Sequence, residues 1–518
     1  MRSGGLGAFL LGLVQRFRLE APALLLSRIL VEHGLLGRVP IARKLFRRLG
    51  RIRLIAPHLD ADYYLRQLPE TWRVAARRDP VLHYALIGAF RNFSPAPGFD
   101  PIFYRADNHD LRWGRDPLAH YARRLLASRD GASAPIATSS LARHQPGRSG
   151  PPGPRGHVVT IQHARGGGSE RYLGLYEASL LRDGYAVTRL ARDTVRAPLF
   201  RPVPLGGPDT PRPIFHILED EAAFRAWLGA SGATRIVLNH IVDLPFEFLA
   251  WLPEVSRDLA IPFDVMVHDY LALCPRINLV DRTGRFCGGP DVADCDACVS
   301  DRRGLATEIR PASWRLAAGD LLRRADRVIA PHDDAARRLL SYWPDLASTV
   351  WEPEDDATLR PPEPTRFSAD RPLRIGIIGA LNVPKGYDVV RRLAAHSSEH
   401  RLPLRFILIG PSQDDAGLKA AGVEVGGRYR EADAADAIRL HRPDIVFVPA
   451  IWPETWSFIL TLALRQRLPV YAFDIGAVAA RLRRLGWGTL LPLSRAEDPS
   501  WLADVFVEAT RRSTTRAA

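Results

Sequence analysis

The sequence is poor in cysteine and in long apolar runs. Its four cysteines all fall between Cys274 and Cys298 in a chain of 518 residues, whereas a disulfide-stabilised secreted protein distributes its cysteines along the chain. This clustering is typical of a reducing compartment, so we expect a cytoplasmic protein. No apolar run reaches the 18 or more residues that identify a membrane-spanning helix.

Lysine is also scarce, because 68 of the 71 basic residues are arginines. With 57 acidic residues the net charge is +14, and a basic chain favours nucleic acid, anionic lipid or phosphate-bearing ligands. The sequence has no zinc finger of the nucleic-acid type, no RNP-like motif and no stripe of interleaved aromatic and basic residues. We therefore expect no nucleic-acid partner.

The first 56 residues alternate leucine-rich turns with arginines. This pattern indicates a basic amphipathic extension, and it fits either a helix on the anionic inner face of the cytoplasmic membrane or a soluble helical segment. A cleaved signal peptide is a third interpretation, although Gln15 and Arg16 end the first apolar run early.

Residues 57–127 contain an internal repeat. Residues 59–65 resemble residues 99–105, and Asp79-Pro-Val-Leu-His-Tyr84 resembles Asp116-Pro-Leu-Ala-His-Tyr121. Each unit predicts short helices with buried aromatic rings, separated by Asp-Pro. Because a structural pattern recurs whereas an active site need not, we interpret the His-Tyr pairs, and the metal-like Asp60-x-Asp62, as structural.

A linker and two Rossmann-like halves follow. Residues 128–156 are rich in Gly, Pro, Ser and Arg, which predicts a flexible linker. Beyond it, β-branched runs alternate with helical spacing, which indicates parallel, doubly wound sheets. The predicted fold is therefore α/β, with Rossmann-like domains over 157–352 and 353–518, after a helical N-terminal region. The strand-like runs are 157–163, 235–240, 263–268, 373–379, 404–410, 444–449 and 469–473.

Two glycine-containing loops follow predicted strands. Gly166-Gly167-Gly168 comes after the first strand and could let backbone amides approach a ligand closely, or form a plain tight turn. The loop from Gly379 to Gly386 contains Lys385, whose compact ammonium could neutralise a diphosphate or simply be solvated.

A third loop runs from Pro449 to Ser457. Pro453 suits the first turn of a helix extending to about Gln466. Glu454 could accept hydrogen bonds from sugar hydroxyls, or compensate the helix dipole. Backbone amides at this helix start would suit an anion, and they belong to Trp456, Ser457 and Phe458.

These motifs together resemble the donor-binding domain of glycosyltransferase family four, retaining enzymes of the GT-B fold with two facing Rossmann-like domains. The resemblance covers roughly Val158 to Leu485, and the first glycine loop with Glu170-Arg171 and the His268-Asp269 pair resemble that family's N-terminal domain. The Asp-Pro-x-x-His-Tyr repeat also resembles segments attached to such enzymes in bacterial surface-polysaccharide systems, including rhamnan-type synthesis.

The resemblance implies a sugar transferase that uses a nucleotide-sugar donor and a glycan or lipid-linked acceptor, with no cofactor required for catalysis. It implies that Lys385 holds the donor diphosphate, that Glu454 binds the donor sugar and that His268 lies near the reacting carbon. The further binding residues that it implies are Gly167, Gly168, Gly379, Gly386, Trp456, Ser457, Phe458, Asp474 and Gly476.

Two positions depart from the family pattern. The second glutamate of the family falls on Leu462, and the arginine that often follows the glycine of the lysine loop is Ala380. Either Arg374 or Arg428 substitutes, or donor binding is weak. A catalytically degenerate scaffold that binds nucleotide or glycan without turnover is therefore the alternative function, and a sugar-nucleotide epimerase of the same fold is a third.

The four cysteines have the spacing Cys274-x12-Cys287-x7-Cys295-x2-Cys298. The final C-x-x-C has chelate spacing, and four thiolates can close a tetrahedral zinc site. We expect either a structural zinc or four unligated thiols at this loop, with redox activity as a third interpretation.

Overall fold

The computed structural model describes residues 50–97, 99–101, 104, 116–128, 155–192, 198–206, 213–289, 292–300, 309–363 and 371–515. Most of the predicted amphipathic extension and of the linker lies outside these residues. The chain divides into two compact units, one of Met1–Arg165 with Gly184–Ala233, the other of Gly166–Asp183 with Thr234–Ala518.

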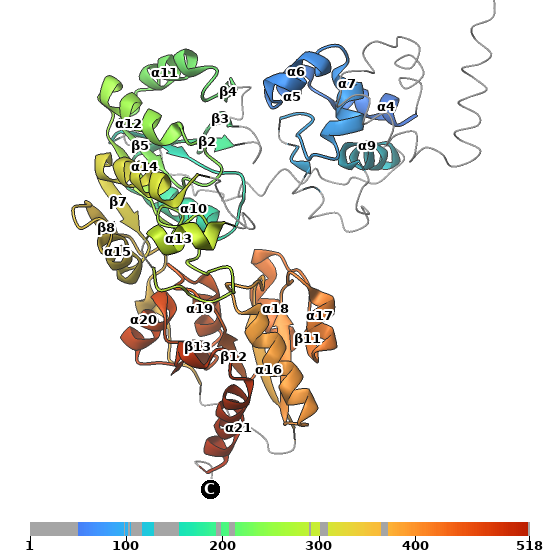
Figure 1. The fold of residues 1–518 in the computed structure, drawn as a ribbon, viewed down its shortest axis with the longest axis vertical. Helices are drawn as coiled ribbons and strands as arrows, with labels where there is room; N and C mark the ends of the chain where they lie inside the picture. Colours follow the sequence, from blue (N-terminus) through green and yellow to red (C-terminus); the bar gives the residue numbers. More distant parts are fainter. Residues whose placement is uncertain are drawn as a thin grey trace, which may run out of the picture. The chain divides into compact units, whose positions relative to one another are not determined.

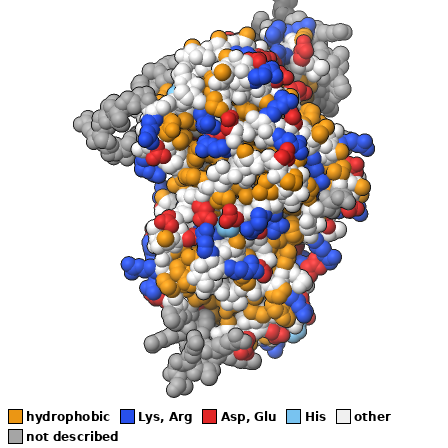
Figure 2. Space-filling view, turned by 90° about the vertical axis from the view of Figure 1, so that its left-hand side faces the viewer, with side chains coloured by type: hydrophobic (Ala, Val, Ile, Leu, Met, Phe, Trp, Pro, Cys, Tyr) orange, Lys and Arg blue, Asp and Glu red, His pale blue; other side chains and the backbone are white. Residues whose placement is uncertain are grey.

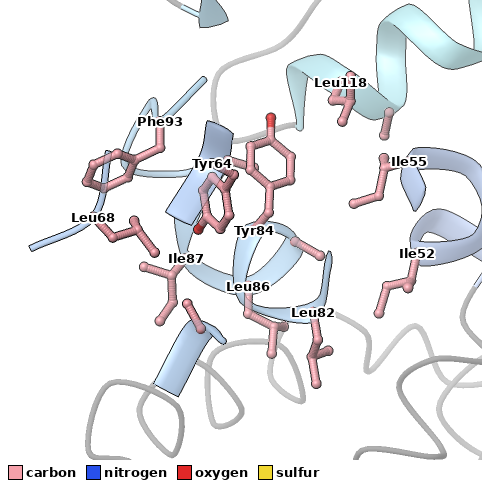
Figure 3. Packing of buried hydrophobic residues seen from close by; sticks show 14 residues of the cluster. Ile52, Ile55, Tyr64, Leu68, Leu82, Tyr84, Leu86, Ile87, Phe93 and Leu118 are labelled. Atoms are coloured by element: carbon pink, nitrogen blue, oxygen red, sulfur yellow. The ribbon is translucent and has the colours of Figure 1, made fainter. Parts of the chain in front are cut away.

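The first unit begins with a group of short helices, which we call the helical module. Its aromatic and aliphatic side chains form one buried cluster around Tyr64 and Tyr84, both 0% exposed, and these two rings meet edge to face (Figure 3). Burial of this apolar surface holds together helices too short to be stable alone. The helices are α4 (Gly50–Ile55), η2 (Ala56–His58), α5 (Ala61–Arg66), α6 (Glu70–Ala76), α7 (Pro80–His83), the π-helical η3 (Tyr84–Gly88) and α9 (Pro117–Ser128).

Corresponding residues of the two sequence units make the same contact. The Tyr64 hydroxyl lies 2.6 Å from His83 Nδ1, and the Tyr104 hydroxyl lies 3.0 Å from His120 Nδ1. Burial lowers the pKa of His83 to about 4, so its ring is neutral at physiological pH. A neutral ring inside an aromatic core has a packing role.

The rest of the first unit contains one helix and four strands of a larger sheet, in the order β4-β3-β2-β1. Strands β1 and β2 are parallel, whereas β3 is antiparallel to β2 and β4 to β3. The helical module contacts the segment after β4, where Arg66 pairs with Asp220 and Arg73 Nη2 lies 2.8 Å from Glu219 Oε1. These elements are β1 (His157–Ile161), β2 (Ala186–Arg192), β3 (Leu199–Pro204), β4 (Phe215–His216) and α11 (Glu221–Ala230).

The second unit contains the parallel strands β5-β6-β7-β8 in sequential order. Asp264 on β6 is fully buried between Arg235 and Arg327, which come from the neighbouring strands. The elements are α10 (Gly168–Arg182), β5 (Arg235–Leu238), α12 (Phe248–Leu259), β6 (Phe263–Met266), α13 (Val292–Val299), α14 (Pro311–Arg324), β7 (Arg327–Ala330), α15 (Asp333–Leu340) and β8 (Ser348–Val350).

A six-stranded parallel sheet follows in the same unit, with strand order β11-β10-β9-β12-β13-β14. The chain builds one side from β9 to β11 and then returns to β12, so β9 and β12 flank the switch point where such sheets bind ligands. Helix α21 packs along α16 (Figure 1). The elements are η4 (Asp356–Thr358), β9 (Leu373–Ile378), α16 (Tyr387–Glu399), β10 (Leu404–Ile409), α17 (Asp415–Ala420), β11 (Val423–Val425), η5 (Glu431–Asp433), α18 (Ala434–His441), β12 (Ile445–Val448), α19 (Phe458–Arg465), β13 (Val470–Phe473), α20 (Gly476–Leu485), β14 (Thr489–Leu491), η6 (Leu493–Arg495) and α21 (Pro499–Thr515).

The predicted fold class is confirmed: the chain is α/β, with mostly parallel sheets after a helical region. None of the helices in the described part of the chain combines the length and apolar character that a bilayer crossing requires. On the face drawn in Figure 2, basic side chains are interspersed with acidic and apolar ones. The excess positive charge is therefore not gathered into one continuous field on that face.

Candidate functional site

The loop that carries Lys385 joins β9 to α16. Asn382 Oδ1 accepts a hydrogen bond from the Lys385 amide at 3.1 Å, and Gly386 caps the helix with φ of +88°. A Cβ on Gly386 would lie 2.1 Å from the Pro449 carbonyl oxygen, so only glycine allows this approach. The glycine loop after β9 therefore packs directly on the loop after β12.

Glu454 lies on that second loop and is buried, with 8% of its side chain exposed. The Lys385 ammonium lies 3.9 Å from Glu454 Oε1, and 42% of the lysine side chain is exposed. The Ala477 amide donates to the Glu454 carbonyl at 2.8 Å, and a Cβ on Gly476 would lie 2.6 Å from Pro453 Cα. The switch point thus brings together two predicted site residues, and Gly476 holds the backbone beneath them.

Helix α19 starts later than the sequence suggested. Its first residue is Phe458, and the Ser457 side chain accepts from the Leu460 amide as its N-cap. The prediction that Pro453 occupies the first helical turn is wrong, because Glu454 to Ser457 form a non-helical turn that bonds to neighbouring loops. Trp456 and Ser457 are buried directly before the helix.

His268 lies two residues after β6, next to this turn. Its Nε2 lies 2.7 Å from Asn239 Oδ1, its ring meets Tyr172 edge to face at 4.8 Å, and its carbonyl accepts from the Thr455 hydroxyl. The Asn239 amide group also donates to the Ser169 carbonyl, which turns Oδ1 toward the imidazole. The contacts with Asn239 and Tyr172 therefore fix the orientation of the ring.

The residues beside His268 add further contacts between the segment after β6 and the loop that carries Glu454. His240 Nε2 lies 2.9 Å from Asp269 Oδ2, and a small cavity between them and His268 has walls from β6 and α14. Tyr270 donates to the Pro453 carbonyl at 2.9 Å. Burial raises the pKa of Tyr270 far above its usual value, so the hydroxyl stays a donor.

The first glycine loop also reaches α19. Gly167 caps α10 with φ of +81°, and a Cβ on Gly168 would lie 3.8 Å from the Phe458 ring. Arg171, in the first turn of α10, places its guanidinium 4.3 Å from the centre of that ring. Gly168 and Phe458, which sequence reasoning assigned separately, are therefore neighbours.

Two predicted contacts have other partners in the structure. Asp474 precedes α20, is exposed and pairs with Arg483 of that helix. Arg374, one candidate to replace the missing family arginine, donates to the His441 carbonyl. Leu462 is half-buried on α19, so no carboxylate stands at the position of the family's second glutamate.

The zinc site predicted from the cysteine spacing has no support. The four cysteines are free thiols, and in the described ranges no group of three or more His, Cys, Asp or Glu side chains could hold a metal ion. Cys295 Sγ accepts from the Arg315 guanidinium at 3.0 Å, and burial raises the pKa of Cys274 to about 11. Burial therefore favours the protonated thiol at Cys274, whereas Arg315 is the hydrogen-bond partner of Cys295.

Several residues that contact the site received no role from the sequence: Asn239, His240 and Glu354 were not singled out, and Arg171 and Thr455 were only part of longer motifs. Asn239 and His240 directly follow β5, and residues at the carboxyl ends of parallel strands meet at one edge, so their position was a usable signal. The Arg171–Glu354 pair spans 183 residues of sequence, and no local pattern indicated it.

Comparisons with known proteins find similar solved structures but no similar sequence. No protein-family model and no curated protein matches the sequence. The structure is similar to Anabaena HepE solved with UDP and glucose, at 16% identity and a TM-score of 0.41, covering 70% of this chain and 95% of that one. It is also similar to sucrose-phosphate synthase from Thermosynechococcus elongatus, at 17% identity and a TM-score of 0.40, covering 70% and 94%. It is also similar to a glycosyltransferase from Rickettsia africae, at 11% identity and a TM-score of 0.42, covering 70% of this chain and 93% of that one.

Proposed function

We propose that this chain is a glycosyltransferase of the GT-B type, which transfers a sugar from a nucleotide-sugar donor to a glycan or lipid-linked acceptor in cell-surface polysaccharide synthesis. The observation that carries the proposal is the Lys385–Glu454 pair at 3.9 Å, on glycine-supported loops at the switch point of a parallel sheet. A cation and a carboxylate at such a point suit the phosphate and the sugar of one donor molecule.

The proposed roles follow from position. Lys385 and the amides at the start of α19 stabilise negative charge on the departing diphosphate, and Glu454 accepts hydrogen bonds from donor hydroxyls. His268, with its ring fixed by Asn239, lies by the donor sugar. Transfer occurs with retention: the acceptor oxygen bonds to the anomeric carbon on the face from which the phosphate oxygen leaves, and that phosphate oxygen takes the acceptor's proton.

The proposed location is the inner face of the cytoplasmic membrane, contacted through the basic N-terminal region. Its support is the alternation of leucine and arginine over the first 56 residues. Flotation of the full chain with vesicles containing anionic lipid, compared with vesicles of neutral lipid, tests it. Equal recovery with both kinds of vesicle would contradict it.

The test of function is a screen of UDP-, GDP- and dTDP-sugars for hydrolysis, together with saturation-transfer NMR of the same compounds. Turnover of at least one donor is the expected result. Binding without turnover would support the second candidate, a degenerate scaffold, which the half-buried Leu462 favours. If no compound binds and none is turned over, both candidate functions are contradicted.

A further inference from the structure

Arg171 is held by two carboxylates of very different character. Its Nη2 lies 3.0 Å from Glu354 Oε1, and its Nη1 lies 2.7 Å from Glu431 Oε1. The Glu354 side chain is 5% exposed, whereas that of Glu431 is 68% exposed. One side of the guanidinium is therefore bound inside the protein, and the other is covered by a solvated side chain.

The buried partner is firmly placed. Glu354 Oε2 accepts from Trp456 Nε1 at 3.3 Å, and its Oε1 also lies 3.4 Å from Arg465 Nη2. A buried carboxylate with several donors exchanges its partners at great cost. The guanidinium also lies over the Phe458 ring, so both its position and its plane are set.

The solvated partner is replaceable. An exposed ion pair gains little over two hydrated ions, and Glu431 sits in the short helix η5 with most of its surface in solvent. Any anion with greater charge at this place competes with Glu431 for Nη1. Gly168 presents only backbone to the Phe458 ring, since a Cβ there would lie 3.8 Å from it.

We propose that Arg171 is the second cationic contact of the donor diphosphate. Nη2 stays on Glu354, and Nη1 exchanges the Glu431 carboxylate for a phosphate oxygen next to the start of α19. The inference rests on the proposed function and supplies the positive charge that Ala380 lacks. The arginine fork suits phosphate oxygens, whereas Arg374 is engaged by the His441 carbonyl.

The two carboxylates give opposite predictions. Arg171→Gln should weaken binding of the best nucleoside diphosphate among UDP, GDP and dTDP about tenfold or more, and weaken the matching monophosphate much less. Glu354→Gln should also weaken diphosphate binding, because the guanidinium loses its anchor. Glu431→Gln should tighten it about twofold or more, because a competing carboxylate is removed.

The measurement is isothermal titration calorimetry of the full chain with each nucleotide. Arg439→Gln is the matched control, since it removes an exposed arginine that pairs with Asp436 on α18, and it should leave affinity unchanged. Diphosphate affinity equal to wild type in Arg171→Gln would overturn the inference while leaving the proposed function intact. Binding of no nucleotide by the wild-type chain would refute the proposed function itself. If Arg171→Gln fails to fold, the sign of the Glu431→Gln effect decides, and weaker binding overturns the inference.

Discussion

At the scale of single residues, the candidate site depends on how one lysine is presented. Lys385 is one of three lysines in the chain, and its loop is tied to the neighbouring one by the bond from the Ile451 amide to the Pro384 carbonyl at 2.9 Å. The ammonium is therefore placed by backbone contacts, while Glu454 gives it only a loose pair at 3.9 Å. Such a group can turn toward a phosphate without disturbing the fold.

Lys385→Ala should lower turnover of the preferred donor by ~10²-fold or more, because it removes charge that stabilises the leaving group. The melting temperature should stay close to wild type, since the side chain is 42% exposed. Lys419→Ala is the control, because it removes another exposed lysine, which lies on α17 between β10 and β11. Turnover equal to wild type in Lys385→Ala would reject the role of this residue.

Gly476 offers a second test at this scale. Gly476→Ala combines a φ of +67° with a Cβ 2.6 Å from Pro453 Cα, so it should displace the Glu454 turn, reduce donor turnover and lower the melting temperature. Gly486→Ala has nearly the same φ, +68°, and nothing within 4 Å, so it should show only the modest cost of the backbone conformation. Similar activities for the two variants would argue against a steric role for Gly476.

At the scale of elements, the helical module depends on paired aromatic and imidazole groups. The pKa of His83 falls to about 4 through burial, whereas the ring in an unfolded chain titrates near 6.5. Below about pH 6.5 the unfolded module binds a proton that the folded module does not. Stability of the module is therefore complete above that pH and is lost as the pH falls toward 4.

Hydrogen exchange checks this expectation. After correction for intrinsic rates, amides of residues 61–93 should lose protection between pH 6.5 and 4, while amides of α16 should change less. His83→Gln should reduce this pH dependence, and it should lower protection of the module at neutral pH because it disturbs the bond to the Tyr64 hydroxyl. Protection that is flat with pH in the wild-type module would contradict the prediction.

At the scale of the second unit, one acidic segment connects distant elements. Glu352 pairs with Arg484, and Asp356 pairs with both Arg484 and Arg481. Arg481 is fully buried, donates to the Ser457 carbonyl at 3.0 Å and lies 3.8 Å from the centre of the Trp456 ring. Glu352 and Asp356, which follow β8, are thus joined to α20 by ion pairs.

Arg481→Met should destabilise the second unit by on the order of 3 kcal/mol, because Asp356 and the Ser457 carbonyl lose a buried donor. The double variant with Asp356→Asn should recover part of the loss, since the carboxylate left with Arg484 as its ionic partner is then neutral. Arg483→Met, on the same helix but paired at the surface with Asp474, should change the melting temperature little. If Arg481→Met and Arg483→Met have equal melting temperatures, the buried contacts of Arg481 with Asp356 and Ser457 do not stabilise the unit.

The elements were largely predictable, because local apolar runs encode buried parallel strands. Residues 404–410 predicted β10 at Leu404–Ile409, and 469–473 predicted β13 at Val470–Phe473. The start of α19 was not predictable, because the turn before it is held by Tyr270 and by the His268 carbonyl. The metal prediction from the cysteine spacing gains no support, because spacing along the chain does not fix where the four sulfurs lie, and the described residues contain no group that could hold a metal ion.

By itself, the sequence determined the alternation of strands and helices and the glycine positions, since each depends on neighbours within a few residues, and it pointed to Lys385, Glu454 and His268 through a family resemblance. Only the tertiary structure decided that Arg171 lies on Phe458 and between Glu354 and Glu431, and that Arg481 is buried beneath Trp456. Ion pairs and ring contacts between residues far apart in the chain exist only after the sheets have folded, because until then the partners are separated by long stretches of flexible chain.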